Sequence, residues 1–263
     1  MKKLLKIINT KIIISLAIIN FLLSQSKDYP ISPIPFSQVR IIDDFFAKKI
    51  ETNHYVTIPI AVQKSKESGR IDNFKRAAGV QAGGFCSIYP FDDSDIYKII
   101  EAASYSIQTF PDEKMDAMID SLIFFTAAAQ EKDGYLYTNR TIKEGKQHPW
   151  AGANRWELVN ELSHELYNLG HLYEAASAHF TATGKRSLLD VAIKSANLVC
   201  NTFGPDKIEN YPGHQEIEIG LVKLYRITGN IKYLNMAKYF LDIRGKENVG
   251  RPDRYNQSHL PVT

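Results

Sequence analysis

Two stretches of this chain share one pattern: YEAASAHFTATGKRSLLDVAIKSA at residues 173–196 and LVKLYRITGNIKYLNMAKYF at residues 221–240. Each contains a helical segment, a Thr-Gly turn and a second helical segment. The turns Thr183-Gly184 and Thr228-Gly229 lie 45 residues apart. Helical hairpins that repeat at a period in the forties predict an α-solenoid or a closed α/α toroid.

Further helices are predicted on both sides of this repeat, and no segment alternates strongly enough to predict a strand. Gly69 is expected to end one helix as its C′ residue. The Gly-rich segment 79–92 and the segment 132–154 are expected to be loops. The expected fold class is all-α, with helices at about 43–52, 60–68, 93–109, 111–130, 157–182, 187–203, 215–227 and 232–244.

The charge of the chain is concentrated at its start. The 263 residues include 32 basic and 29 acidic side chains, a net charge of +3. Residues 1–26 hold four lysines and no acid, so residues 27–263 carry 28 basic and 29 acidic side chains, a net charge of −1. This balance gives no reason to expect nucleic acid as a partner. No GxGxxG or Walker-type loop predicts a nucleotide cofactor.

Residues 1–26 have the pattern of a signal peptide. Lysines precede an apolar run from Ile12 to Leu23, and the small residues Ser24 and Ser26 fit a cleavage site after Ser26. The run is shorter than the roughly 20 residues that a bilayer span needs. We therefore expect a secreted or periplasmic protein with no transmembrane span in its mature part; an uncleaved N-terminal anchor is the alternative.

The predicted helix 157–182 carries both an apolar and a polar stripe. Leucines and Tyr173 recur every three or four residues, and His164, Asn168 and His171 recur at the same spacing on another face. The polar face is either the lining of a cavity or a solvated surface. His164 and His171 stand about two turns, or roughly 10 Å, apart along a helix. That separation excludes a zinc site built from these two histidines alone.

Other candidate residues lie outside this helix. His214 stands where a Gly/Pro loop enters a helix, a place with free N–H groups for a polar ligand, although a capping role is equally compatible. Cys86 and Cys200 are too few for a disulfide scaffold or a four-cysteine zinc module, and nothing in the sequence pairs them. No nucleophile elbow supports a Ser-His-Asp triad.

Three motifs in order resemble those of a known enzyme family. They are FDDSDIYK at residues 91–98, SHELYNLGHLYEAA at residues 163–176 and PGHQEIE at residues 212–218, with DGYL at 133–136 and FLDIRG at 240–245 in support. Together they resemble glycoside hydrolase family 127, the β-L-arabinofuranosidases, over nearly all of the chain after its leader.

The resemblance implies several properties. It implies an (α/α)6 barrel, removal of terminal β-L-arabinofuranose from plant-type glycans with retention, and a substrate-binding role for His164 and His214. The family's nucleophile is a cysteine held on zinc by further cysteines and a glutamate, with another glutamate as acid/base. Those residues lie beyond the part of the family pattern that ends here with residues 257–262. We therefore expect no catalytic residue, metal ligand or cofactor in this chain, and little hydrolase activity.

Three functional hypotheses follow. The first is a truncated β-L-arabinofuranosidase, with residues 1–26 as signal peptide and 27–263 as the N-terminal portion of an incomplete (α/α)6-barrel catalytic domain. The second is a non-catalytic helical module that binds L-arabinofuranose-containing glycans or another partner. The third is a different α/α-toroid enzyme with a carboxylate pair across its cavity. Its candidate carboxylates are Asp93, Asp95, Glu161 and Glu216.

Overall fold

The computed structural model describes residues 31–244 of the chain, and none of these belongs to a β-strand. The chain divides into two compact units, residues 1–40 and 41–263. In the first unit, the described residues contain one turn of 3-10 helix, Phe36–Gln38. The leader predicted for residues 1–26 and the family segment at 257–262 lie outside the described residues.

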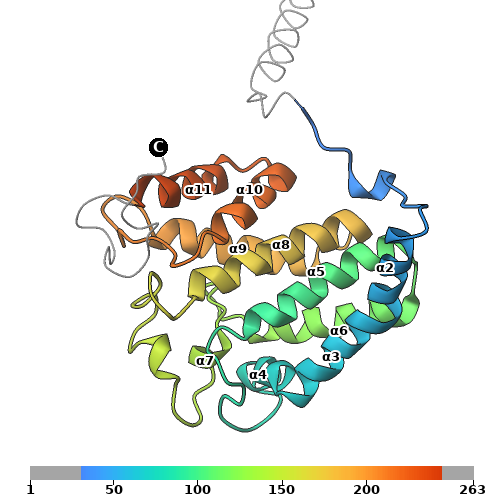
Figure 1. Ribbon diagram of the computed structural model, residues 1–263. Helices are drawn as coiled ribbons and strands as arrows, with labels where there is room; N and C mark the ends of the chain where they lie inside the picture. The colour runs from blue at the N-terminus through green and yellow to red at the C-terminus, as the bar shows by residue number, and fades with distance from the viewer. Residues whose placement is uncertain (1–30, 245–263) are drawn as a thin grey trace, which may run out of the picture. The chain divides into compact units, whose positions relative to one another are not determined.

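The second unit is built from helices (Figure 1). None of the described helices has both the length and the apolar character that a bilayer crossing requires. The helices are α2 (Phe46–Thr52), α3 (Ile58–Glu67), α4 (Arg70–Ala77), α5 (Asp93–Thr109), α6 (Glu113–Ala129), α7 (Thr138–Thr141), α8 (Glu165–Thr183), α9 (Ser187–Thr202), α10 (Ile217–Thr228) and α11 (Ile231–Ile243).

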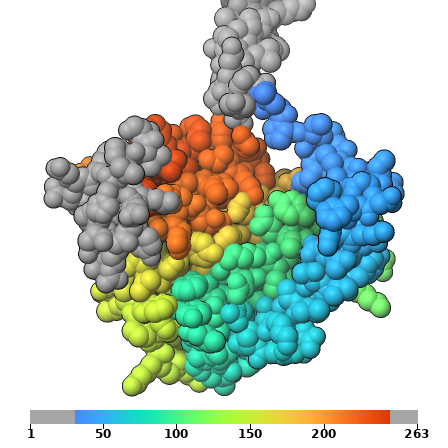
Figure 2. All heavy atoms as spheres, viewed as in Figure 1, coloured from blue at the N-terminus to red at the C-terminus, as the bar shows by residue number. Residues whose placement is uncertain are grey.

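The helices after residue 92 form the predicted hairpins. The pairs are α5 with α6, α8 with α9, and α10 with α11. Helix α8 packs between α5 and α10 in one layer, while α9 packs between α6 and α11 in a second layer. Figure 2 shows α8 as a narrow yellow band between the green of α5 and the orange of the α10 region. This all-α, two-layer arrangement is that of the helical hairpins of an α/α barrel.

The two Thr-Gly turns are equivalent in structure as well as in sequence. Gly184 and Gly229 have φ angles of +74° and +68°, in the left-handed region that side chains disfavour. Each glycine N–H donates to the carbonyl four residues earlier, on Phe180 and Tyr225, at 2.8 Å. Both helices therefore end in the same cap, and the predicted repeat is confirmed.

The N-terminal helices differ from the prediction in two ways. A π-helical turn, Asn53–Thr57, joins α2 to α3 where the sequence predicted a break. The π turn lets the helix continue to Pro59, which has no N–H to donate. Helix α4 was not predicted; it is only eight residues long and is held by its buried Ile71 and Phe74.

The predicted start of the long histidine helix is wrong. Helix α8 begins at Glu165, and residues 155–162 form turns, so Leu158 and Leu162 precede the helix. Trp156 and His164 have φ angles of +68° and +56°, which a regular helix does not allow. His164 therefore stands at the N-cap of α8, and it does not share a helix face with Asn168, which is fully buried.

Candidate functional site

A pocket of about 340 Å³ lies where three helices begin. The start of α5, the N-cap of α8 and the residues before α10 all contribute to its wall, so these three helices run in the same direction. Helix N-termini present N–H groups that their own helix does not use. The residues that line the pocket are Phe91, Asp92, Ser94, Asp95, Lys98, His164, Tyr167 and His214.

The structure brings the two predicted site histidines together. The rings of His164 and His214, 50 residues apart in sequence, have centroids 4.9 Å apart. Tyr167 lies 5.6 Å from each ring, and Phe91 lies 4.5 Å from the ring of His164. Lys98 Nζ donates to the Tyr167 hydroxyl at 2.8 Å. The pocket thus combines aromatic walls with polar groups from separate helices.

The protonation of His164 follows from its surroundings. Its Nδ1 lies 2.8 Å from the carbonyl oxygen of Leu162, which can only accept, so Nδ1 carries the hydrogen. Burial lowers the pKa of His164. Burial also lowers the pKa of His214, with a contribution from the charge of Arg244. His164 is therefore neutral at pH 7, and its Nε2 is a hydrogen-bond acceptor.

A buried carboxylate fixes the segment that carries His164. Glu165 accepts hydrogen bonds from the Trp156 backbone N–H, the Ser163 hydroxyl and the Tyr135 hydroxyl. These bonds tie together Trp156 and His164, two residues with left-handed backbone, because Glu165 directly follows His164. Glu165 therefore holds His164 in a conformation that costs free energy outside this setting.

The segment that carries His214 is anchored to the same loop. The Gly213 N–H donates to the Val159 carbonyl at 2.9 Å. The buried Arg244 donates to the Pro212 carbonyl and stacks on Tyr211, 4.6 Å from the ring centroid. The two histidine segments are thus fixed to each other as well as to the helices behind them.

The carboxylates proposed from sequence are not gathered in this pocket. Asp95 lines it and pairs with Arg70 at 2.7 Å. Asp93 is buried and accepts from the backbone and hydroxyl of Thr138. Burial raises the pKa of Asp93 to about 7, although Thr138 opposes the shift. Glu161 is not among the lining residues, and Glu216 belongs to another cluster.

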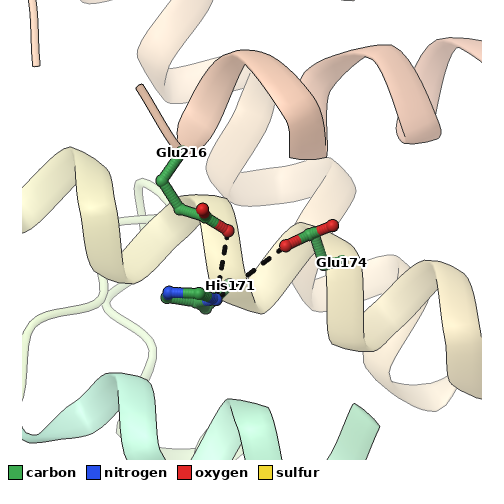
Figure 3. Close-up of side chains that lie close together, drawn as sticks. All are labelled: His171, Glu174 and Glu216. Atoms are coloured by element: carbon green, nitrogen blue, oxygen red, sulfur yellow. Dashed lines mark ion pairs between the residues drawn. The ribbon is translucent and has the colours of Figure 1, made fainter. Parts of the chain in front are cut away.

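That cluster joins His171, Glu174 and Glu216 (Figure 3). Within residues 31–244, it is the group of three or more His, Cys, Asp and Glu side chains whose geometry could hold a metal ion. Burial raises the pKa of Glu216 to about 8, reinforced by Glu174, and lowers the pKa of His171 to about 4. The sequence contained one signal for this cluster, the helical spacing of His171 and Glu174. It contained no signal that Glu216 lies beside them.

Neither cysteine belongs to a group of side chains that could hold a metal ion within residues 31–244. Cys86 Sγ lies 3.2 Å from the Gly69 carbonyl and the Asn73 side chain, while Cys200 Sγ lies 3.8 Å from the Lys232 carbonyl. Burial raises the pKa of the Cys86 thiol and raises that of Cys200 to about 11. With no metal ion beside them, both thiols therefore keep their proton at neutral pH.

Comparisons with known proteins agree on one family. The sequence model of the family β-L-arabinofuranosidase, GH127 catalytic domain, matches residues 38–263. A non-reducing end β-L-arabinofuranosidase of Bifidobacterium longum is 40% identical over 183 residues, which are 69% of this chain and 27% of that protein.

Two solved structures are also similar. A GH127 β-arabinofuranosidase is 50% identical with a TM-score of 0.83, over 89% of this chain and 37% of its own. A GH127 β-L-arabinofuranosidase from Geobacillus stearothermophilus T6 is 37% identical with a TM-score of 0.78, over 85% of this chain and 38% of its own. The chain thus spans well under half the length of these relatives.

Proposed function

This chain belongs to the β-L-arabinofuranosidase family of glycoside hydrolases, GH127, and we propose that its pocket binds a terminal L-arabinofuranosyl residue of a plant-type glycan. The observation that carries the proposal is the convergence of His164 and His214, whose rings lie 4.9 Å apart in a pocket of about 340 Å³. A volume of this size accepts a monosaccharide and excludes most of a polymer.

The side chains of the pocket suit a furanose ring. The neutral His164 accepts a hydrogen bond from a sugar hydroxyl at Nε2, and Lys98 and Ser94, which also line the pocket, offer donors. Phe91 and Tyr167 provide apolar surface for the C–H groups of the sugar. A few placed polar groups on aromatic walls are typical of small-ligand sites, where they set the orientation of the ligand.

Binding without turnover is the activity that we assign to the chain of 263 residues. Within residues 31–244, neither Cys86 nor Cys200 belongs to a group of side chains with the geometry to hold a metal ion. Residues 27–263 then act as the substrate-binding, N-terminal portion of a glycosidase catalytic domain. The alternative is a non-catalytic helical module that binds carbohydrates or another partner. It would use the same pocket, but it would not be part of a glycosidase catalytic domain.

Calorimetric titration with methyl β-L-arabinofuranoside tests the proposal. Wild-type protein should bind the sugar, and His164→Ala and His214→Ala should each weaken binding about three- to tenfold, the effect of one or two lost hydrogen bonds. Asn235→Ala is the matched control, because Asn235 lines a different pocket between α9 and α11. Equal affinities for all four proteins would contradict the assignment of the site.

A turnover assay tests the proposal that the chain binds the sugar without hydrolysing its glycosidic bond. A nitrophenyl β-L-arabinofuranoside with added zinc should release no nitrophenol above background. Zinc-dependent turnover by this chain would show that it contains a nucleophile that we have not recognised. Absence of sugar binding together with absence of turnover would favour a different partner for the module.

Export is part of the same proposal. A secreted or periplasmic protein meets glycans that do not enter the cell, and residues 1–26 have the pattern of a cleaved leader. Edman sequencing of the exported protein should give Lys27 as its first residue. A first residue of Met1 on protein recovered from the membrane fraction would support an anchor instead.

A further inference from the structure

Three side chains of types that can bind a metal ion, those of His171, Glu174 and Glu216, lie close together. His171 and Glu174 lie three residues apart on α8 and therefore point to the same side of the helix. Glu216 is the residue before α10 and reaches them from that helix (Figure 3). Close packing allows this approach: a Cβ on Gly170 of α8 would lie 2.6 Å from the Glu216 backbone carbon.

The separations between these side chains are those of ligands around one ion. His171 Nδ1 lies 3.0 Å from Glu216 Oε1 and 3.9 Å from Glu174 Oε2. One ligand atom of each residue lies within 4.8 Å of those of the other two. Zinc holds nitrogen and oxygen ligands at about 2.0–2.2 Å, so its ligand atoms stand about 3–4 Å apart. Small side-chain rotations would therefore close the three groups on an ion.

We propose that His171, Glu174 and Glu216 form a binding site for one divalent transition-metal ion of the zinc type. One imidazole and two carboxylates leave at least one coordination position for water, which is the pattern of an open zinc site. Nitrogen with carboxylate oxygen favours zinc over magnesium and calcium, which prefer oxygen ligands alone. The inference does not depend on the sugar-binding proposal, because it rests on other side chains.

The hydrogen bonding of the cluster leaves its ligand atoms available. In the part of the chain that the structure describes, both ring nitrogens of His171 and Oε1 of Glu216 are buried and make no hydrogen bond of acceptable geometry. The side chains of all three residues are 13–14% exposed, so an ion can enter from solvent. Buried polar atoms without a partner are uncommon in proteins, and a ligand is one explanation for them.

The surrounding charges are compatible with an ion. Lys223 Nζ binds Oε1 of Glu174 and leaves Oε2 toward the cluster, as an outer partner of a ligating carboxylate does. Glu101 also lies near Lys223, at 3.7 Å, and shares its charge. By contrast, Asp116 and Asp120 on α6 are both bonded by Lys185, and among residues 31–244 they belong to no set of three side chains with the geometry to hold a metal ion. That surface group serves as a control.

Zinc titration of the full chain tests the proposal. The background is Cys86→Ser with Cys200→Ser, which removes thiol ligands for zinc. Calorimetry should give one zinc ion per chain, and cobalt(II) should give the visible absorption of a low-symmetry nitrogen and oxygen site. His171→Gln and Glu216→Gln should each weaken zinc binding tenfold or more, whereas Asp116→Asn should leave it unchanged.

Two outcomes would overturn the proposal. One is the absence of stoichiometric zinc binding by the background protein, in which case the two glutamates share a proton. The other is zinc binding by the His171 and Glu216 variants that is as tight as zinc binding by the background protein. If a variant fails to fold, as judged by circular dichroism, zinc anomalous scattering from crystals of the background protein decides: an ion bound by the three side chains supports the site, and an ion elsewhere contradicts it.

Discussion

At the scale of single residues, His164 depends on a buried neighbour. His164 has a left-handed backbone without being a glycine, and Glu165 joins the loop before it to the helix after it through three donors. Such backbone strain persists only where the surroundings fix it. Glu165 is therefore the residue on which the geometry of the sugar pocket depends most directly.

Glu165→Gln should lower the free energy of unfolding by about 1–3 kcal/mol, because a glutamine side chain has one acceptor oxygen for three buried donors. The measurement is urea unfolding followed by circular dichroism. Glu67→Gln is the matched control on the exposed end of α3, where loss of its pair with Lys64 should change stability by less than about 1 kcal/mol. Equal effects of the two variants would contradict the role of Glu165.

Asp93 should make stability fall as pH rises. Its pKa is about 7 in the folded chain and about 3.8 in an unfolded chain, so between these values the folded state keeps a proton that the unfolded state has lost. The contribution of Asp93 to stability is therefore complete below about pH 4. It falls as pH rises from about 4 and is lost once pH has passed through about 7. Urea midpoints from pH 5 to 8 should show a smaller decline in Asp93→Asn than in wild type. Identical pH profiles would exclude the shift.

The sequence singled out His164 and His214 as candidate site residues but not the groups that position them. The family resemblance singled out both histidines, and their rings do meet. No rule of spacing gives a left-handed conformation to a tryptophan or a histidine, so the early start of the predicted helix at 157 was wrong. The carboxylate of Glu165 creates that conformation through contacts with residues 135, 156 and 163, which only the folded chain brings together.

At the scale of elements, α8 and α10 approach each other closely through glycines. A Cβ on Gly220 would lie 2.7 Å from the Gly170 carbonyl, as one on Gly170 would collide with Glu216. Two glycines that face each other let the helices touch through their backbones. This contact sets the distance between the part of the chain that holds His164 and the part that holds His214.

Gly170→Ala should therefore destabilise the chain by about 1–3 kcal/mol, although alanine is the better helix former, because overpacking outweighs propensity here. It should also weaken binding of methyl β-L-arabinofuranoside. Thermal unfolding and calorimetry measure the two effects. Asn235→Ala, on the exposed face of α11, should be neutral or slightly stabilising. A Gly170→Ala protein as stable as wild type would contradict the close contact.

Elements with strong local signals were the ones that sequence could predict. Asp112 caps α6 through hydrogen bonds to the N–H groups of Lys114 and Met115, and Gly184 ends α8 as expected. Helix α4 gave no such signal, because it is short and its stability comes from packing of Ile71 and Phe74. The meeting of Glu216 with His171 depends on how α8 packs on α10, which no local pattern encodes.

At the scale of the whole molecule, the parallel start of α5, α8 and α10 creates the pocket. One layer of an α/α barrel places the N-termini of its helices at the same end, so residues about 120 positions apart in sequence share one small volume. The arrangement explains how a chain that spans 37–38% of its solved relatives retains a formed pocket.

A crystal structure of the chain with methyl β-L-arabinofuranoside tests the central claim most directly. We expect the furanose in the pocket between Phe91 and Tyr167, with a hydroxyl within hydrogen-bond distance of His164 Nε2 and another near His214. The glycosidic bond to the methyl group should remain intact. A sugar bound elsewhere on the chain, or in this pocket without contact to either histidine, would contradict the account.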